Sequence, residues 1–153
     1  NELNIPVVCM GLSDVVVSVN PEGILVADKE QSSQIKPYVD RIDHQIMFAE
    51  KSWGDFRIID AEEGSITIKI VMNAGQSMNY HSHSRRDEIW NIVSGQGVVC
   101  IDGMEHPVNA GDVITIQAGC KHMISSISEL RIIEIQLGQD ISVQDKQKHE
   151  IDR

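Results

Sequence analysis

The chain has 153 residues, enough for one domain to bury a hydrophobic core of its own. Its formal net charge of −10 argues against nucleic acid or an anionic membrane as the main partner, because both demand a basic face. No apolar run approaches the roughly 20 residues that a membrane-spanning helix needs. An anionic small molecule stays compatible with this charge where cationic side chains gather locally.

The three cysteines, Cys9, Cys100 and Cys120, are a sparse and odd-numbered set without C-x-x-C spacing. Such a set is typical of reduced thiols in a cytoplasmic protein, and the sequence carries no signal peptide. We therefore expect a cytoplasmic protein. The first residue is Asn1 rather than methionine, as expected of a piece of a longer chain.

Residues 1–48 predict a small β-rich segment that ends in one α-helix. Three short β-rich runs, at residues 5–10, 15–19 and 24–27, are separated by turn-forming residues. A sheet this small is not expected to be stable alone, so the segment should pack against something else.

A helical period replaces the β pattern towards the end of this segment. Four apolar residues recur at helical spacing with polar residues between them: Ile35, Val39, Ile42 and Ile46. Pro37 must then lie in the first turn of the helix or kink its axis. We expect the helix at residues 34–47.

Residues 49–153 predict an all-β domain. Short strands with even turn spacing indicate a barrel or jelly roll, and Asp102-Gly103 is a strong hairpin signal. The polar tail from residue 140 to 153 is expected to be a strap or a loose end. We expect the strands at residues 55–60, 65–72, 78–83, 88–94, 97–102, 104–108, 113–117, 122–126 and 130–137.

Metal-binding residue types lie in the middle of this domain. His81 and His83 stand two residues apart, so on a strand both side chains project from one face. Glu88 follows beyond a polar turn and can fold back beside them, and His122 lies far downstream. Three histidines and one carboxylate form a ligand set suited to a divalent transition metal. The pattern predicts a metal site inside a small β-barrel.

The strand that carries the two histidines has a polar face. Ser77 and Asn79 are expected on the same side as His81 and His83, because strand side chains alternate. Burying such a face dry and unpaired is costly. We therefore expect the face either to be exposed or to line a polar cavity that holds the metal.

The chain resembles the cupin family in two motifs. The second motif is similar to the stretch from Gly111 to His122, with Gln117 in place of its proline and Ser126 in place of its final asparagine. The first motif is reproduced by the spacing of Gly75, His81, His83, Glu88 and Gly95.

The resemblance implies a fold and a ligand set. The fold is the cupin double-stranded β-helix, a jelly-roll barrel, preceded by the small β-rich segment and the helix. Zinc is the favoured metal, with manganese, iron, nickel or cobalt as further candidates. The resemblance implies that the metal is coordinated by His81, His83, Glu88 and His122.

Within the cupins, the chain looks closest to the type II mannose-6-phosphate isomerase domain, which forms the C-terminal part of bifunctional mannose-1-phosphate guanylyltransferases. Residues 1–48 look like the end of the guanylyltransferase part. The glycine-rich phosphate loop of that part is absent, so this chain alone is not expected to transfer GMP. The resemblance is carried by residues 51–54, 86–90, 93–95, 121–122 and 133–136.

The resemblance implies a metal-dependent aldose–ketose isomerase that interconverts mannose 6-phosphate and fructose 6-phosphate through an enediol. The implied partner is a phosphorylated hexose, and a homodimer is expected. Many type II isomerases carry glutamine where His81 stands, which puts the metal's identity in question more than its presence.

Six further residues are candidates for catalysis or substrate binding. Cationic side chains next to the ligands could hold the phosphate or a developing oxyanion. Glu134 could act as the base or orient a metal-bound histidine. Catalytic roles are expected for Glu134, Arg86 and Lys121. Substrate-binding roles are expected for Arg85, Asn79 and Gln136.

Two other functions fit the same residues. One is a non-catalytic cupin module that binds sugar phosphate or mediates dimerisation and regulates an attached nucleotidyltransferase. The other is an iron dioxygenase, because three histidines and a glutamate also suit non-haem iron. The aromatic fraction of 4% leaves little to line the apolar pocket that a dioxygenase would need.

Overall fold

The structure is a computed structural model that describes residues 1–3, 5–41, 46–142 and 145–150. The chain divides into two compact units, residues 1–48 and residues 49–153. Across the described residues, no helix is long and apolar enough to cross a bilayer. The three cysteines are free thiols.

The first unit contains one β-hairpin, formed by β1 (Val15–Asn20) and β2 (Gly23–Asp28). The Asn20 side chain closes its turn by accepting hydrogen bonds from the amides of Glu22 and Gly23. The strand predicted at residues 5–10 is wrong: the whole range is described, and no strand forms there. A strand needs a partner for its backbone groups, and this run has none in the two-stranded sheet.

The predicted helix is much shorter than expected. Among the described residues of the predicted range, only α1 (Lys36–Val39) is helical, after a 3₁₀ turn at Ser32–Gln34. Pro37 lies in its first turn, as predicted, but α1 buries none of its residues, so no packing offsets the cost of helix nucleation. The prediction of helix at residues 34–47 is therefore wrong beyond Val39, while residues 42–45 lie outside the described part.

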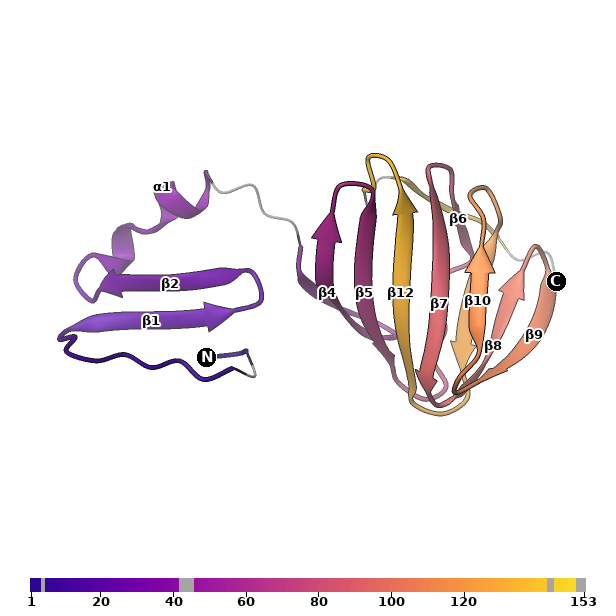
Figure 1. Ribbon diagram of the computed structural model, residues 1–153, viewed down its shortest axis with the longest axis horizontal. Helices are drawn as coiled ribbons and strands as arrows, with labels where there is room; N and C mark the ends of the chain where they lie inside the picture. The colour runs from indigo at the N-terminus through magenta and orange to yellow at the C-terminus, as the bar shows by residue number, and fades with distance from the viewer. Residues whose placement is uncertain (4, 42–45, 143–144, 151–153) are drawn as a thin grey trace. The chain divides into compact units, whose positions relative to one another are not determined.

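The second unit consists of two antiparallel sheets (Figure 1). The five-stranded sheet has the order β13-β6-β11-β8-β9 and the six-stranded sheet the order β10-β7-β12-β5-β4-β3. The five-stranded sheet comprises β6 (His81–His83), β8 (Gln96–Ile101), β9 (Met104–Asn109), β11 (His122–Ser126) and β13 (Lys146–Lys148). The six-stranded sheet comprises β3 (Phe48–Lys51), β4 (Gly54–Glu62), β5 (Ser65–Met72), β7 (Arg86–Ser94), β10 (Val113–Ile116) and β12 (Leu130–Gly138).

The all-β prediction is confirmed. Asp102 and Gly103 form the predicted hairpin turn between β8 and β9, with φ of 47° and 83°. Of the strand predicted at residues 78–83, only β6 forms, so the prediction is wrong for residues 78–80. Two strands, β3 and β13, were not predicted. In β13 the polar tail acts as a strap, pairing with β6 along the edge of the five-stranded sheet.

The inner face of the six-stranded sheet changes from apolar to polar along two neighbouring strands. On β12 the buried side chains run from Leu130 and Ile132 to Glu134 and Gln136. On β7 they run in the opposite direction, and Glu88 stands directly across from Gln136. The antiparallel register therefore gathers polar side chains at one end of the strand pair, which is where the site lies.

Candidate metal centre

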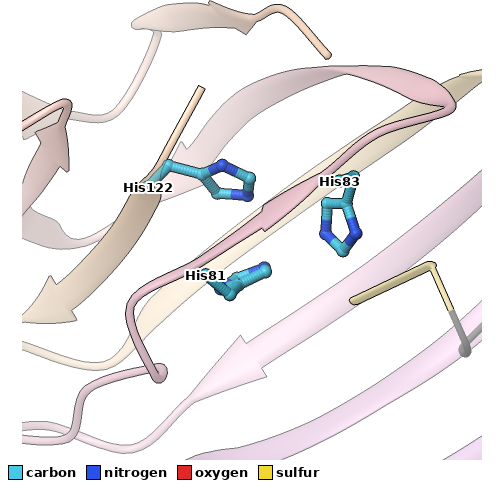
Figure 2. A group of neighbouring side chains, drawn as sticks. All are labelled: His81, His83 and His122. Atoms are coloured by element: carbon cyan, nitrogen blue, oxygen red, sulfur yellow. The ribbon is translucent and has the colours of Figure 1, made fainter. Parts of the chain in front are cut away.

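Three histidines meet inside the second unit (Figure 2), and we call them the histidine cluster: His81, His83 and His122. His81 and His83 come from β6, and His122 on β11 stands directly across from His81. All three are buried, with at most 3% of each residue exposed. One ligand atom from each lies within 4.8 Å of the others, and the ring centroids are 4.3–5.5 Å apart. Cross-strand pairing of His81 and His122 thus makes the cluster.

The fourth predicted ligand, Glu88, comes from the other sheet. Its carboxylate lies 3.1 Å from Nε2 of His83 and 3.3 Å from Nε2 of His122. β7 supplies it because the short Ser84–Arg85 turn leads directly from β6 into the six-stranded sheet. The structure therefore brings the four predicted ligands together from both sheets.

Backbone carbonyls fix the orientation of each ring. Nδ1 of His81 lies 2.6 Å from the carbonyl oxygen of Asn79, and Nδ1 of His122 lies 2.9 Å from that of Cys120. Nδ1 of His83 lies 3.2 Å from the carbonyl oxygen of Asp145. A carbonyl oxygen can only accept, so each Nδ1 carries the proton that it donates. The Nε2 atoms are left to face the shared centre, as in metal-binding histidines.

The residues present fit a divalent cation. Nε2 of His122 is buried and is without a hydrogen-bond partner in the described part of the chain. Burial and, to a smaller extent, the charge of Lys146 together lower the pKa of His81 to about 3, so this imidazole is neutral. Arg86 and Trp90 each donate a hydrogen bond to the Glu88 carboxylate, and such donors favour its ionised form. Neutral imidazole and ionised carboxylate are the forms that bind metal.

Arg86 holds Glu88 in place. Its Nε donates to Glu88 Oε1 at 3.1 Å, and the indole of Trp90 donates to Oε2 at 3.1 Å. The other guanidinium nitrogens contact Nε2 of His83 at 3.1 Å and the carbonyl of Ser142 at 3.0 Å. Arg86 is itself buried. Its donors therefore serve the protein, and the structure gives this predicted catalytic residue a positioning role.

Glu134 and Gln136 lie on the inner face of β12, buried beside the ligands. Glu134 stands across from Trp90, and the Gln136 amide donates to its carboxyl group. Burial and the charge of Glu88 raise the pKa of Glu134 to about 8. Glu134 therefore carries a proton at neutral pH, next to an ionised carboxylate.

The remaining predicted residues lie at the surface. Lys121 and Asn79 are exposed, and Asn79 serves the site through its carbonyl oxygen. Arg85 is exposed and has its Nε 3.8 Å from the Asp145 carboxylate. Ser77 is exposed too, because the chain is not a regular strand before His81, so the predicted polar face is wrong there.

Two residues near the site, Asp145 and Lys146, were not predicted from the sequence. Asp145 is 5% exposed and contacts the Ser84–Arg85 turn. Lys146 stands directly across from His83 in the β13–β6 pair, and its charge acts on His81. Both residues are in a tail without apolar periodicity, so the sequence gives no local signal for either.

Comparison with known proteins supports this architecture. Residues 68–136 match the family described as Cupin domain. A mannose-1-phosphate guanylyltransferase of Escherichia coli is 26% identical over 86% of this chain and 30% of its own length. Mannose-1-phosphate guanylyltransferase 2 of another Escherichia coli strain is 26% identical over 94% of this chain and 32% of its own length. The chain spans about a third of these curated relatives.

Solved structures share the fold at low sequence identity. A Klebsiella pneumoniae protein with a double-stranded β-helix domain gives a TM-score of 0.56 at 15% identity, covering 62% of this chain and 83% of that one. Oxalate decarboxylase of Bacillus subtilis gives 0.59 at 18% identity, covering 65% and 28%. Residues 68–136 therefore form a cupin domain, and the unit that contains them is folded as a double-stranded β-helix with the histidine cluster in its interior.

Proposed function

We propose that this domain binds a divalent metal ion and interconverts mannose 6-phosphate and fructose 6-phosphate. The observation that carries the proposal is the convergence of three carbonyl-oriented imidazoles and one ionised carboxylate on a single buried point. The relatives are named for mannose 1-phosphate, so a phosphorylated mannose is the substrate class that we propose. Three nitrogens and one oxygen favour zinc, with manganese, iron, nickel and cobalt as further candidates.

The reaction moves a hydrogen from C2 to C1 of the sugar and a proton between the two attached oxygens, through an enediol. A divalent ion held at the centre would supply Lewis acidity towards those oxygens. In its carboxylate form Glu134 can take the proton from C2 and return it to C1, because a pKa of about 8 keeps both of its forms accessible near neutral pH. Gln136 fixes the Glu134 carboxyl group, and Arg86 and Trp90 keep Glu88 in place.

The phosphate needs a cation that the protein does not already use. Arg86 is committed to Glu88, His83 and Ser142, and Arg85 has its Nε 3.8 Å from the Asp145 carboxylate. Lys121 and Lys146 are both exposed, so exposure does not decide between them. Lys146 lies directly opposite His83, and such cross-strand pairs project from the same face of a sheet. Lys146 thus faces the side of the sheet on which the histidines converge. We include it in the proposal as the phosphate-binding cation.

An isomerase assay on the zinc-loaded full chain tests the proposal. We expect turnover of mannose 6-phosphate that a chelator abolishes and added zinc restores. Lys146→Met should raise KM several-fold and leave zinc content unchanged, whereas Lys69→Met, which removes an exposed lysine of β5, should change neither. Zinc-loaded protein without turnover would contradict the isomerase proposal.

The second candidate is a non-catalytic module that binds sugar phosphate, or pairs as a homodimer, and regulates an attached nucleotidyltransferase. The names of the relatives favour it, because they denote a guanylyltransferase. Calorimetric binding of mannose 6-phosphate without turnover would support this candidate, and light scattering would test the homodimer. Oxygen uptake by the iron-loaded protein would instead support a dioxygenase.

A further inference from the structure

The segment after β12 reaches back to the candidate metal centre. β13 pairs with β6, so that Lys146 opposes His83 and Lys148 opposes His81. The His149 amide continues this pairing by donating to the Tyr80 carbonyl at 2.9 Å. The part of the chain that matches the cupin family ends at residue 136, before these contacts. The contacts are therefore an addition to the matched barrel.

One buried side chain, Asp145, holds the turn between the two ligand-bearing strands. Its Oδ1 accepts hydrogen bonds from the amide and the hydroxyl of Ser84, at 3.1 and 2.6 Å. Its Oδ2 accepts from the amide of Arg85 at 3.1 Å. Burial raises the pKa of Asp145, but these donors lower it more, so the group remains a carboxylate. A single carboxylate therefore fixes the turn through which β6 passes into β7.

This turn sets the position of the ligands on either side of it. His83 ends β6, and Glu88 lies three residues past Arg85, on β7. The carbonyl of Asp145 also receives the Nδ1 proton of His83, and the Ser142 carbonyl receives a hydrogen bond from Arg86. Arg86 in turn binds Glu88. The segment thus acts on one ligand directly and on another through Arg86.

We infer that Asp145 is a positioning residue of the metal centre, and that metal binding and docking of the β13 segment strengthen each other. The inference rests on the metal centre proposed above. If the docked segment fixes His83 and Glu88 in binding geometry, it raises metal affinity. By thermodynamic linkage, the bound metal must then favour the docked segment by the same factor.

Zinc titration of full-length variants tests the first half of the inference. Asp145→Ala removes the acceptors for three donors and should weaken zinc affinity about 10- to 100-fold, as outer partners of metal ligands do elsewhere. Glu150→Ala removes an exposed carboxylate five residues further along the same segment and should leave the affinity unchanged. Asp145→Asn keeps the side-chain volume and one acceptor oxygen, so we expect an intermediate affinity. Circular dichroism checks that each variant is folded.

Amide hydrogen exchange tests the second half on the wild-type chain and needs no variant. Zinc should slow exchange of the amides in β13 and of His149, because the docked state becomes more populated. An unchanged exchange rate in zinc-bound wild type would overturn the inference, and so would a folded Asp145→Ala protein that binds zinc as tightly as wild type. A wild-type chain that binds no zinc would instead overturn the proposed metal centre itself.

Discussion

Glu88 supplies the negative charge of the predicted ligand set, and its burial has to be compensated. It is 2% exposed and accepts hydrogen bonds from Arg86 and Trp90. A buried carboxylate is costly unless each oxygen is paired, and a cation among the histidines would complete its pairing. Removing one of the histidines should therefore lower metal affinity, while Glu88 keeps its hydrogen bonds from Arg86 and Trp90.

His122→Ala should abolish stoichiometric metal binding. The substitution removes the buried Nε2 atom that has no hydrogen-bond partner among the described residues, and it leaves the backbone pairing of β11 with β6 in place. We expect zinc affinity to fall more than about 100-fold, beyond the loss typical of outer partners. Metal content by mass spectrometry and zinc titration measure this. His106→Ala, at an exposed histidine of β9, is the matched control, and equal losses in both variants would contradict the assignment.

Glu134→Gln should remove a pH dependence of stability in the metal-free protein. The pKa of Glu134 rises from 4.5 to about 8 on folding, so between these values the folded state holds a proton that the unfolded state releases. Stability due to this group is therefore present below pH 4.5 and is lost as pH rises towards 8.

Urea unfolding at pH 5 and pH 8 measures this loss. Wild type should lose on the order of a few kcal/mol between the two pH values relative to Glu134→Gln. Glu62→Gln, at an exposed glutamate of β4, should keep the wild-type slope. The same slope in all three proteins would show that Glu134 is ionised at neutral pH.

Three members of the candidate ligand set were predictable because their spacing is local, whereas His122 lies far downstream and was included through its place in the second cupin motif. His81 and His83 are two residues apart, and Glu88 follows within one turn. Asp145 is 61 residues away from Ser84, and only the pairing of β13 with β6 brings the two together. Arg86 was predicted as a catalytic residue because the sequence shows its charge and cannot show that Glu88 and Ser142 occupy its donors.

At the level of strands and turns, Gly95 allows the passage from β7 into β8. Its φ is 90°, and a Cβ at this position would lie 2.1 Å from the carbonyl oxygen of Glu129. Gly111 has nearly the same conformation, with φ of 94°, but nothing lies within 4 Å of its Cβ position. Comparing alanine substitutions at these two glycines therefore separates the cost of the left-handed backbone from the cost of steric overlap.

Gly95→Ala should cost more stability than Gly111→Ala. The left-handed backbone alone should cost each variant about 1–2 kcal/mol. Overlap with Glu129 should cost Gly95→Ala about 1–3 kcal/mol more. Urea denaturation of both variants measures the difference, and equal losses would mean that the chain around Glu129 relaxes freely.

The barrel strands were predictable because the alternation of apolar and polar residues and the turn-forming residues are local features of the sequence. The departure at Ser126 from the second cupin motif has a structural explanation: its hydroxyl donates to the carbonyl of Asn73 and accepts from the amide of Gln76, which ties that loop to β11. The prediction of a helix at residues 34–47 was wrong beyond Val39 because apolar periodicity alone does not supply a surface on which the helix can pack. Strand β13 was not predicted because its residues are polar and because its strand conformation depends on pairing with β6.

For the whole domain, the proposed metal would link the two sheets. His81, His83 and His122 belong to the five-stranded sheet and Glu88 to the six-stranded one. A ligand that binds only the folded state stabilises it by mass action, so zinc at a hundredfold excess over its Kd should add about 2.7 kcal/mol to the free energy of unfolding.

Thermal unfolding with zinc and with a chelator measures this effect. Wild type should unfold at a higher temperature in zinc, and His122→Ala should show the same midpoint in both conditions. Matching shifts in wild type and His122→Ala would place the stabilising zinc somewhere else on the chain.

The carbonyl oxygens of Asn79 and Cys120 accept the ring protons of His81 and His122. These oxygens belong to the backbone, so they remain when the side chain at either position is substituted. Random mutagenesis is therefore expected to report both positions as tolerant, although each decides which ring nitrogen of a histidine is bare. Semisynthesis would reveal their importance: an ester bond in place of the Asn79–Tyr80 amide weakens the acceptor without touching a side chain.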